Sequence, residues 1–400
     1  MKTRIVFLVC AGVVFFAGTD HADGSAMHHA ARAPHVIQSE QKNSAHDYVV
    51  ALVKKKLALF MRRHKIPGAA IALYANGHQY LFHSGYADKE NKLPVTEKTV
   101  FEIGSVTKLF TCLLIAQEVR AGTMCLTDSI RDYIPALTTN RRLKHMTLER
   151  LATHTSTLPF NVPESINSKD KFISYLSRWR MPCVASYPYL YSNPGIELLR
   201  CALEETTRCP FQELVMNRIL LPLGMNPIGI YVPEKYKEYR ARCYDKAGAL
   251  TTWWCHPLLL GSAALRASSA DMLAFLKAAI GLPGTPESIL YAMRMTQTAY
   301  MSLGADGLGL GWSIRDVQAL TLRKRLGGLF HHAQVRRVKT AKQVFKGNAF
   351  FEKTGTTEGF HAYIAVMPNK AKGIVVMVNR TMPKGWNVMS KMGRGLLLAV

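Results

Sequence analysis

Three short motifs along this chain combine side chains that could carry out acyl transfer. A serine and a lysine occur in Ser105-Val106-Thr107-Lys108, a tyrosine and an asparagine in Tyr191-Ser192-Asn193, and Lys353-Thr354-Gly355 lies near the C-terminus. Each motif alone is common in a chain of 400 residues. All three in this order are typical of a serine hydrolase that forms an acyl-enzyme.

Ser105 and Lys108 have the spacing of one helical turn. Residues i and i+3 share a helix face, so the Lys108 amine would lie beside the Ser105 hydroxyl. A serine hydroxyl is a weak nucleophile until an adjacent base removes its proton. Lys108 could be that base if it is partly desolvated, or it could lower the pKa of another base nearby.

Tyr191 is the natural partner of this pair. A phenol has an ordinary pKa of about 10, and the ammonium groups of Lys108 and Lys353 are predicted to lower it. Asn193 has both an amide donor and an acceptor, which suits a substrate amide. Gly355 would let a substrate approach a strand backbone closely, and the next amide could stabilise an oxyanion.

The residues that flank the motifs extend the pattern. The chain has Phe101-Glu102-Ile103-Gly104, Leu158-Pro159-Phe160-Asn161, Leu221-Pro222-Leu223-Gly224-Met225 and Gly307-Leu308-Gly309-Leu310-Gly311-Trp312. As a set, from about residue 45 to the end, the sequence resembles a class C β-lactamase. This class lies within the wider family of serine β-lactamases and D-Ala-D-Ala peptidases, the penicillin-binding proteins.

The resemblance implies a role for each matching residue. Ser105 would be the acylated nucleophile, Lys108 and Tyr191 would handle protons with Tyr191 as general base, and Lys353 would supply positive potential. The backbone amides of Ser105 and Thr356 would form the oxyanion hole. Substrate would be bound by Asn161, Asn193, Thr354, Gly355 and Thr356. The resemblance implies no cofactor and no metal site.

Four positions depart from the family pattern. His154 stands where class C enzymes often have a tyrosine, and Asn161 stands where they usually have a glutamine. Thr381 and Lys384 occupy the places of asparagines that contact the substrate carboxylate. Lys384 could still attract a carboxylate as a point charge. His154 also fits an ordinary buried, hydrogen-bonded histidine.

Strand patterns occur at both ends of the chain. Residues 68–74 and 79–84 flank Asn76-Gly77, a strong signal for a tight hairpin turn. A second strand pair is predicted at 361–367 and 373–378, a closing helix at 386–400, and an amphipathic helix at 46–64.

These elements predict an α/β (α+β) fold with an antiparallel sheet flanked by helices. The sheet part would comprise residues 45–104 and 250–400, and a mostly helical region, 105–249, would be inserted between them. The active site would lie at the junction, a common place for pockets. Residues 45–400 would thus form one catalytic domain.

The N-terminus has the pattern of a secretory signal. A basic start, Met1 to Arg4, precedes an uncharged apolar run that is too short to span a membrane. We expect a signal peptide over about 1–24, a flexible segment over 25–44, a periplasmic location and no transmembrane span. After removal of the signal peptide seven cysteines remain, for which no disulfide pairing follows: Cys112, Cys125, Cys183, Cys201, Cys209, Cys243 and Cys255.

The formal net charge is +24, and it is unevenly distributed. A basic segment, residues 323–346, lies in a stretch without acidic residues. It is predicted to be a solvated surface, with contact to an anionic cell-envelope polymer as the alternative. No nucleic-acid-binding motif accompanies the charge.

Three functions remain open at this point. The first is a β-lactamase, which hydrolyses its acyl-enzyme quickly. The second is a D-Ala-D-Ala carboxypeptidase or endopeptidase, or a related penicillin-binding protein, which releases β-lactam adducts slowly. The third is a non-catalytic envelope-binding protein, against which the intact set of motifs argues. The motif flanks favour the first.

Overall fold

The computed structural model describes residues 35–180, 188–254, 256–303, 306–317, 336–337, 339–343 and 349–400. The expected signal peptide and most of the basic segment 323–346 lie outside these ranges. Two units are distinguished, Met1–Tyr48 and Val49–Val400. The second contains all the motifs described above.

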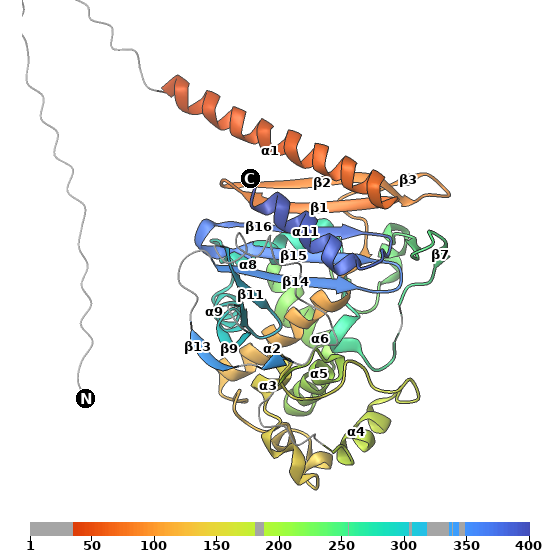
Figure 1. Cartoon of the computed structure of the whole chain (residues 1–400), viewed down its shortest axis with the longest axis vertical. Coiled ribbons are helices and arrows are strands. Elements are labelled where there is room, and N and C mark those ends of the chain that lie inside the picture. Colours follow the sequence, from red (N-terminus) through yellow and green to blue (C-terminus); the bar gives the residue numbers. More distant parts are fainter. Residues whose placement is uncertain are drawn as a thin grey trace, which may run out of the picture. The chain divides into compact units, whose positions relative to one another are not determined.

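An antiparallel sheet is the centre of the second unit (Figure 1). Among the described residues its strand order is β13-β9-β10-β11-β14-β15-β16-β1-β2-β3. The N-terminal hairpin β1–β2 is therefore hydrogen-bonded to the C-terminal strand β16. The strands are β1 (Gly68–Ala75), β2 (His78–Asp88), β3 (Leu93–Pro94), β9 (Ala299–Leu303), β10 (Asp306–Leu308), β11 (Ser313–Asp316), β13 (Lys339–Gln343), β14 (Ala349–Thr356), β15 (His361–Met367) and β16 (Lys372–Val378).

Turn chemistry explains the two central hairpins. Asn76 and Gly77 both have positive φ, 54° and 79°, as a tight turn between β1 and β2 requires. Between β15 and β16, the short 3-10 helix Pro368–Lys370 ends at Ala371, which has a φ of 44°. Both hairpins were predicted from the sequence.

Each face of the sheet has its own hydrophobic core. Alternate residues of β1, such as Ile71 and Leu73, pack with one cluster, whereas Ala70 and Ala72 pack with another. The first cluster includes α11 (Gly385–Leu397) and the Val49–His64 part of α1 (His35–His64). The second includes α8 (Ser269–Ile280) and continues into the helical region. The period of two in the strands therefore divides the core into two layers.

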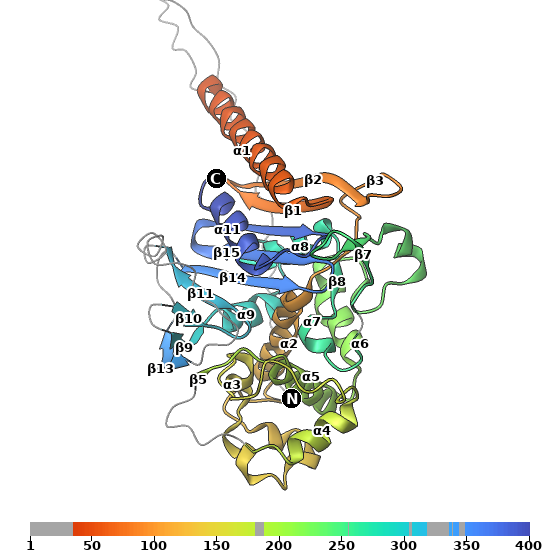
Figure 2. The same cartoon turned by 45° about the vertical axis from the view of Figure 1, so that its right-hand side comes forward.

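The helical region lies on the α8 side of the sheet, where α2, α5 and α7 are visible below the central strands (Figure 2). Its helices are α2 (Thr107–Ala121), α3 (Leu148–Ala152), α4 (Lys169–Ser177), α5 (Asn193–Thr207), α6 (Phe211–Val215), α7 (Leu260–Ala263) and α9 (Glu287–Thr296). Short strand pairs connect it: β4 (Phe101–Glu102) with β8 (Arg266–Ala267), β5 (Pro188–Tyr189) with β12 (Arg336–Arg337), and β6 (Cys243–Tyr244) with β7 (Leu250–Thr251).

The predicted fold class is confirmed: helices flank a large antiparallel sheet. The flexible segment predicted for 25–44 stays a prediction; α1 begins at His35, earlier than the helix start predicted at residue 46. No glycine or proline lies between Pro34 and Pro67, so nothing in the sequence interrupts this helix. The finer division into a sheet part and a helical part stays a prediction. In the described portion, no helix meets the length and apolarity needed for a membrane span.

Candidate active site

The nucleophile turn, the 3-10 helix Gly104–Val106, leads directly into α2. Lys108 Nζ lies 2.9 Å from Ser105 Oγ, so the i and i+3 spacing does place the two side chains on one face. Lys108 also donates a hydrogen bond to the carbonyl oxygen of Ser262 at 2.8 Å. The amine is thereby held from two directions.

Lys108 has no solvent-exposed surface. Burial, and next to it the nearby positive charge of Lys353, hold the pKa of the Lys108 amine well below its ordinary value. A neutral amine has a free electron pair and can accept the Ser105 proton while it still donates to Ser262. The environment therefore suits a base.

Tyr191 lies between the two lysines. The centre of its ring is 5.0 Å from Lys108 Nζ and 4.7 Å from Lys353 Nζ. Burial raises the pKa of the Tyr191 phenol, and its hydrogen bond with Ser105 counteracts this only in part. The predicted lowering of this pKa is therefore wrong. Removing a phenolate from water costs more than these lysines, themselves buried, return.

Two glycines let the nucleophile turn touch the end of β14. A Cβ atom on Gly104, which has a φ of 50°, would lie 2.6 Å from the Thr356 nitrogen. A Cβ atom on Gly355 would lie 1.9 Å from the carbonyl oxygen of Ile103. Neither contact is possible for a larger residue. The two glycines thus bring the backbones of Ser105 and Thr356 together, as an oxyanion hole requires.

Lys353 projects from the same strand end. Burial lowers the pKa of its amine to about 8. The preceding residue, Glu352, lies on the opposite face of the sheet and binds Arg315 and Arg394, the latter at 3.0 Å. Tyr363 also donates to Glu352 at 2.8 Å. This ion-pair cluster holds β14 on the sheet face opposite to Lys353.

The side chains of Asn161 and Asn193 contact each other and are solvent-accessible. Asn193 Nδ2, at the start of α5, donates to Asn161 Oδ1 at 2.7 Å. His154 is buried, accepts the Ser192 N–H at Nδ1 (3.3 Å), and packs its ring 4.2 Å from that of Tyr191. His154 therefore supports Tyr191 through ring packing, consistent with the buried, hydrogen-bonded alternative.

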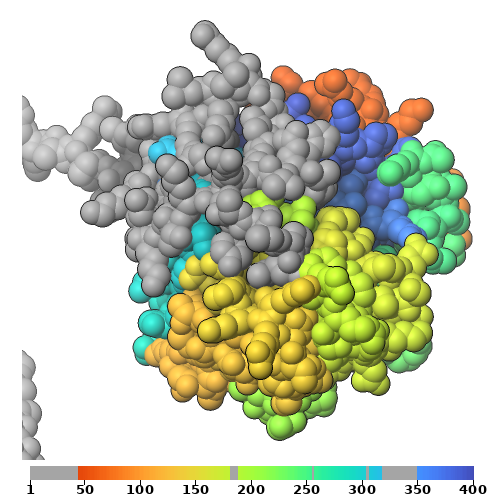
Figure 3. All heavy atoms as spheres, turned by 60° about the horizontal axis from the view of Figure 1, so that its bottom comes forward, coloured from red at the N-terminus to blue at the C-terminus, as the bar shows by residue number. Residues whose placement is uncertain are grey.

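A cavity of about 640 Å³ opens at the C-terminal end of β14, next to Thr356. Its lining includes Thr356, Trp254, Thr381 and Lys384. Thr381 is buried, and its hydroxyl donates to the Glu358 carbonyl at 2.8 Å, whereas Thr356 and Lys384 are exposed. On this side of the molecule the C-terminal residues (blue) border those of the helical region (yellow-green), as Figure 3 shows.

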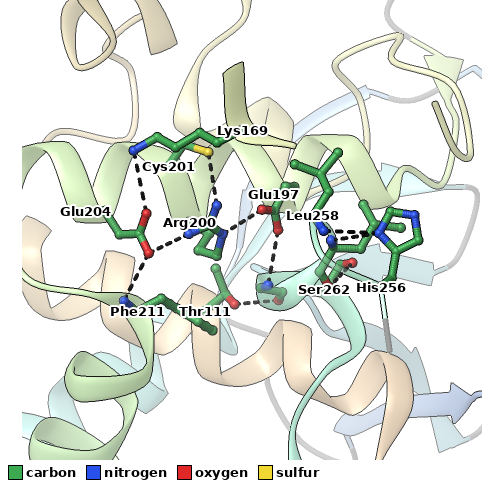
Figure 4. A network of polar contacts seen from close by, with 12 residues as sticks. Thr111, Lys169, Glu197, Arg200, Cys201, Glu204, Phe211, His256, Leu258 and Ser262 are labelled. Atoms are coloured by element: carbon green, nitrogen blue, oxygen red, sulfur yellow. Dashed lines mark hydrogen bonds and ion pairs between the residues drawn. The ribbon is translucent and has the colours of Figure 1, made fainter. Parts of the chain in front are cut away.

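A buried polar network supports the carbonyl that holds Lys108 (Figure 4). Glu197 accepts hydrogen bonds from Arg200 Nε at 2.6 Å and from the Gly261 N–H at 3.1 Å. Thr111 donates to the Gly261 carbonyl at 2.6 Å. The backbone N–H and carbonyl of Gly261, the residue before Ser262, are therefore both held by side chains. Burial raises the pKa of Glu197 to about 7.

The structure brings Ser105, Lys108, Tyr191 and Lys353 together, with the Thr354–Thr356 strand end beside them. The sequence did not reveal Ser262, whose backbone oxygen has no sequence signal, nor Glu197, which lies one turn after Asn193 in α5. It also did not reveal His361, described below. Trp254 lines the cavity, whereas Trp253 packs on Phe360 at 5.5 Å.

Two observations concern cysteines and metals. Among the described residues, five cysteines are free thiols: Cys112, Cys125, Cys201, Cys209 and Cys243. Throughout the described ranges, no group of three His, Cys, Asp or Glu side chains could hold a metal ion.

Known proteins share both the sequence and the architecture. Residues 51–390 match the family model described as Beta-lactamase. A β-lactamase from Pseudomonas fluorescens is 31% identical over 333 residues, covering 82% of this chain and 92% of the relative. The class C β-lactamase structure from Rhodobacter sphaeroides aligns with a TM-score of 0.79 at 27% identity, covering 87% of this chain and 98% of the other. A D-alanine carboxypeptidase from Burkholderia cenocepacia also aligns with a TM-score of 0.79, at 28% identity and with 88% and 99% coverage.

Proposed function

The chain belongs to the beta-lactamase family and is a serine β-lactamase, and we propose that it opens β-lactam rings through an acyl-enzyme on Ser105. The observation that carries this assignment is the environment of Lys108. Its buried amine lies 2.9 Å from Ser105 Oγ and is held in place by the Ser262 carbonyl. A serine next to a fixed amine whose pKa is lowered by burial has a base within hydrogen-bond reach.

In the acylation step, Ser105 Oγ attacks the lactam carbonyl carbon while its proton moves to Lys108 Nζ. The carbon–nitrogen bond of the lactam then breaks, and the ring nitrogen takes up a proton. Tyr191 is placed to relay this proton, because its phenol is hydrogen-bonded to Ser105 and stays protonated in its buried position. Lys108 is thus the base and Tyr191 the proton donor, a different division from the one that the resemblance implied.

The negative charge on the carbonyl oxygen needs donors at the moment of attack. The backbone amides of Ser105 and Thr356, brought together by Gly104 and Gly355, would supply them. Removing one such donor from other hydrolases typically costs about 10²–10³ in rate. In the second half-reaction, a water molecule attacks the ester carbonyl and gives one proton to the Lys108–Tyr191 pair. The bond between the acyl carbon and Ser105 Oγ then breaks, and this proton is passed to Ser105 Oγ, which restores the free enzyme and releases the product as a carboxylic acid.

Substrate recognition would use both ends of the site. Asn161 and Asn193, which are hydrogen-bonded to each other, would bind the side-chain amide of a β-lactam. Lys353, Thr354, Thr356 and Lys384 would bind its carboxylate. Lys353 is protonated below a pKa of about 8 and therefore carries the charge at neutral pH.

The test follows turnover and covalent adduct in one experiment. Mature protein is incubated with a chromogenic cephalosporin, and ring opening and the mass of the protein are recorded together. We expect many turnovers with little trapped adduct. A long-lived adduct with a single turnover would contradict the hydrolytic assignment and would favour a penicillin-binding peptidase.

A D-Ala-D-Ala peptidase is the second candidate, and the similarity to a D-alanine carboxypeptidase structure supports it. Its substrate also ends in a carboxylate next to the scissile amide, so the same residues would bind it. Release of D-alanine from an acyl-D-Ala-D-Ala tripeptide would support this activity. Absence of release at enzyme concentrations that hydrolyse the cephalosporin would exclude it.

We further infer export to the periplasm from the basic and apolar pattern of residues 1–17. Contact between the basic segment 323–346 and an anionic envelope polymer remains a proposal. Sedimentation with purified cell walls, compared with a variant in which the lysines and arginines of this segment are neutralised, would test it. Equal sedimentation of both would reject it.

A further inference from the structure

His361 begins β15 and lies directly opposite Thr356, the last residue of β14, in the register of the sheet. His361 is only 2% exposed, although both it and Thr356 border the cavity. No sequence motif singles out this histidine. Its hydrogen bonds connect the substrate-binding strand to the segment that contains Lys384.

One of these hydrogen bonds fixes the proton position on the ring. The backbone N–H of Met382 points at His361 Nε2 at 2.9 Å. A backbone amide can only donate, so Nε2 has to be the unprotonated acceptor. The proton of the neutral imidazole is therefore on Nδ1.

The second hydrogen bond then follows a fixed direction. His361 Nδ1 lies 2.9 Å from Thr356 Oγ1. Because Nδ1 carries the proton, the threonine oxygen accepts, and its own O–H is left to donate elsewhere. Among the described residues, this is the one hydrogen bond that Thr356 Oγ1 makes. The Thr356 O–H is therefore available to donate to a ligand, and it lies on an exposed side chain at the cavity.

Packing and burial keep the ring in this state. A Cβ atom on Gly385 would lie 1.9 Å from His361 Nε2, so the first residue of α11 packs tightly against the ring. Burial lowers the pKa of the imidazole to about 4, which keeps it neutral near pH 7. The ionisable side chains that line the same cavity are Asp245, Lys246, Glu358 and Lys384.

We propose that His361 is a positioning residue for substrate recognition: it fixes Thr356 as a hydrogen-bond donor toward an anionic substrate group, the carboxylate. A threonine that donated to the protein would present only lone pairs, which repel a carboxylate. The inference rests on the proposed function only in the choice of ligand. It also explains why a buried, fully hydrogen-bonded histidine is present at the end of the substrate-binding strand.

The main test compares two substrates that differ in charge. Acylation rates are measured, by formation of the covalent adduct, for a cephalosporin with a free carboxylate and for its methyl ester. The readout is the ratio of the two rates. A protein that acylates but does not turn over still gives this ratio, so failure of the hydrolytic function and failure of this inference remain distinguishable.

Two histidine variants separate the two hydrogen bonds. In His361→Asn, the side-chain amide can replace the Nδ1 donor to Thr356, and the Met382 N–H loses its acceptor. In His361→Gln, the carbonyl can reach the Met382 N–H, and Thr356 loses its donor. We expect His361→Asn to keep the wild-type ratio and His361→Gln to lower it by about 10-fold, as befits loss of one charge-assisted hydrogen bond.

Matched threonine variants keep the test decisive if a histidine variant does not fold. Thr356 is exposed, so Thr356→Val and Thr356→Ser should both fold. We expect Thr356→Val to lower the carboxylate-to-ester ratio about 10-fold and Thr356→Ser to preserve it. An unchanged ratio in Thr356→Val, or equal losses in His361→Asn and His361→Gln, would overturn the proposal. So would an Nε2–H tautomer for His361 in the ¹⁵N NMR spectrum of the wild-type protein.

Discussion

The two ends of the active site are built on different principles. At the nucleophile end, Ser105, Lys108 and Tyr191 contact one another, and two of them are buried. At the carboxylate end, Thr356 and Lys384 are exposed side chains around a cavity. The first end contains the Ser-x-x-Lys and Tyr-Ser-Asn motifs, whereas the second includes Thr381 and Lys384, the positions where the sequence resemblance predicted asparagines.

The difference follows from what each end has to do. Proton transfer requires atoms within hydrogen-bond reach and a shifted pKa, and both depend on exclusion of water. Carboxylate binding requires donors and positive charge, which several combinations of side chains can supply. We therefore expect changes at the nucleophile end to reduce the rate on every substrate, and changes at the carboxylate end to act selectively.

The largest effect is expected for Ser105→Ala. Loss of the only proposed nucleophile should abolish both turnover and the covalent adduct with a penicillin. Mass spectrometry of the intact protein after incubation checks this. If an adduct persists, and peptide mapping places it on another serine, the nucleophile end has been assigned wrongly.

Removal of the base comes next. Lys108→Met keeps an unbranched side chain of similar length in the same buried position and removes the amine from Ser105. We expect acylation to fall by about 10²–10⁴ for a cephalosporin and for its methyl ester alike. Pre-steady-state acylation rates measure this, with the thermal midpoint as a control for folding.

Tyr191→Phe is the matched comparison, because the ring and its contact with His154 remain. A fall of about 10²–10⁴ in acylation rate would support a proton-relaying phenol. Full activity of Tyr191→Phe would remove the tyrosine from the mechanism and leave Lys108 as the sole proton carrier.

The next prediction concerns Lys353, which lies beside Tyr191 and is also proposed to bind the carboxylate. The pKa of the Lys353 amine is about 8, so its positive charge is present below this pH and is lost as the pH rises through it. For a carboxylate-bearing substrate, kcat/KM should therefore decline above about pH 8 in the wild type. Lys353→Arg, which stays protonated, should move this decline to higher pH.

The methyl ester provides the control for Lys353. With no carboxylate to bind, its kcat/KM should change much less in Lys353→Ala, whereas the free acid should lose about 10- to 100-fold. Equal losses on both substrates would mean that Lys353 acts on Tyr191 or on the strand rather than on the carboxylate.

The smallest effect is expected for Lys384→Ala at the rim of the cavity. An exposed charge contributes little, typically about 0.2–1 kcal/mol. KM for cephalosporins should rise by a few-fold, with kcat nearly unchanged. Steady-state kinetics at low ionic strength measures this. No change in KM would leave recognition of the carboxylate to Lys353, Thr354 and Thr356.

Much of the fold was predictable because its signals are local. Asn76-Gly77 predicted the first hairpin, and two short, nearly continuous apolar runs predicted β15 and β16. The full length of α1 was missed, because the polar stretch 35–44 looked like an unstructured terminus. At the active site, i and i+3 spacing predicted the contact of Ser105 with Lys108.

The sequence by itself determined which side chains could do chemistry: a serine, a lysine and a tyrosine in motifs whose order indicates acyl transfer. Tertiary structure alone decided the direction in which the pKa values of Lys108 and Tyr191 shift. Burial reversed the expected shift of the Tyr191 pKa, since desolvation depends on packing of distant segments. Tertiary structure also brought Ser262 to Lys108 and His361 to Met382, which are partners from other parts of the chain. Long-range contacts of this kind have no pattern in a linear sequence.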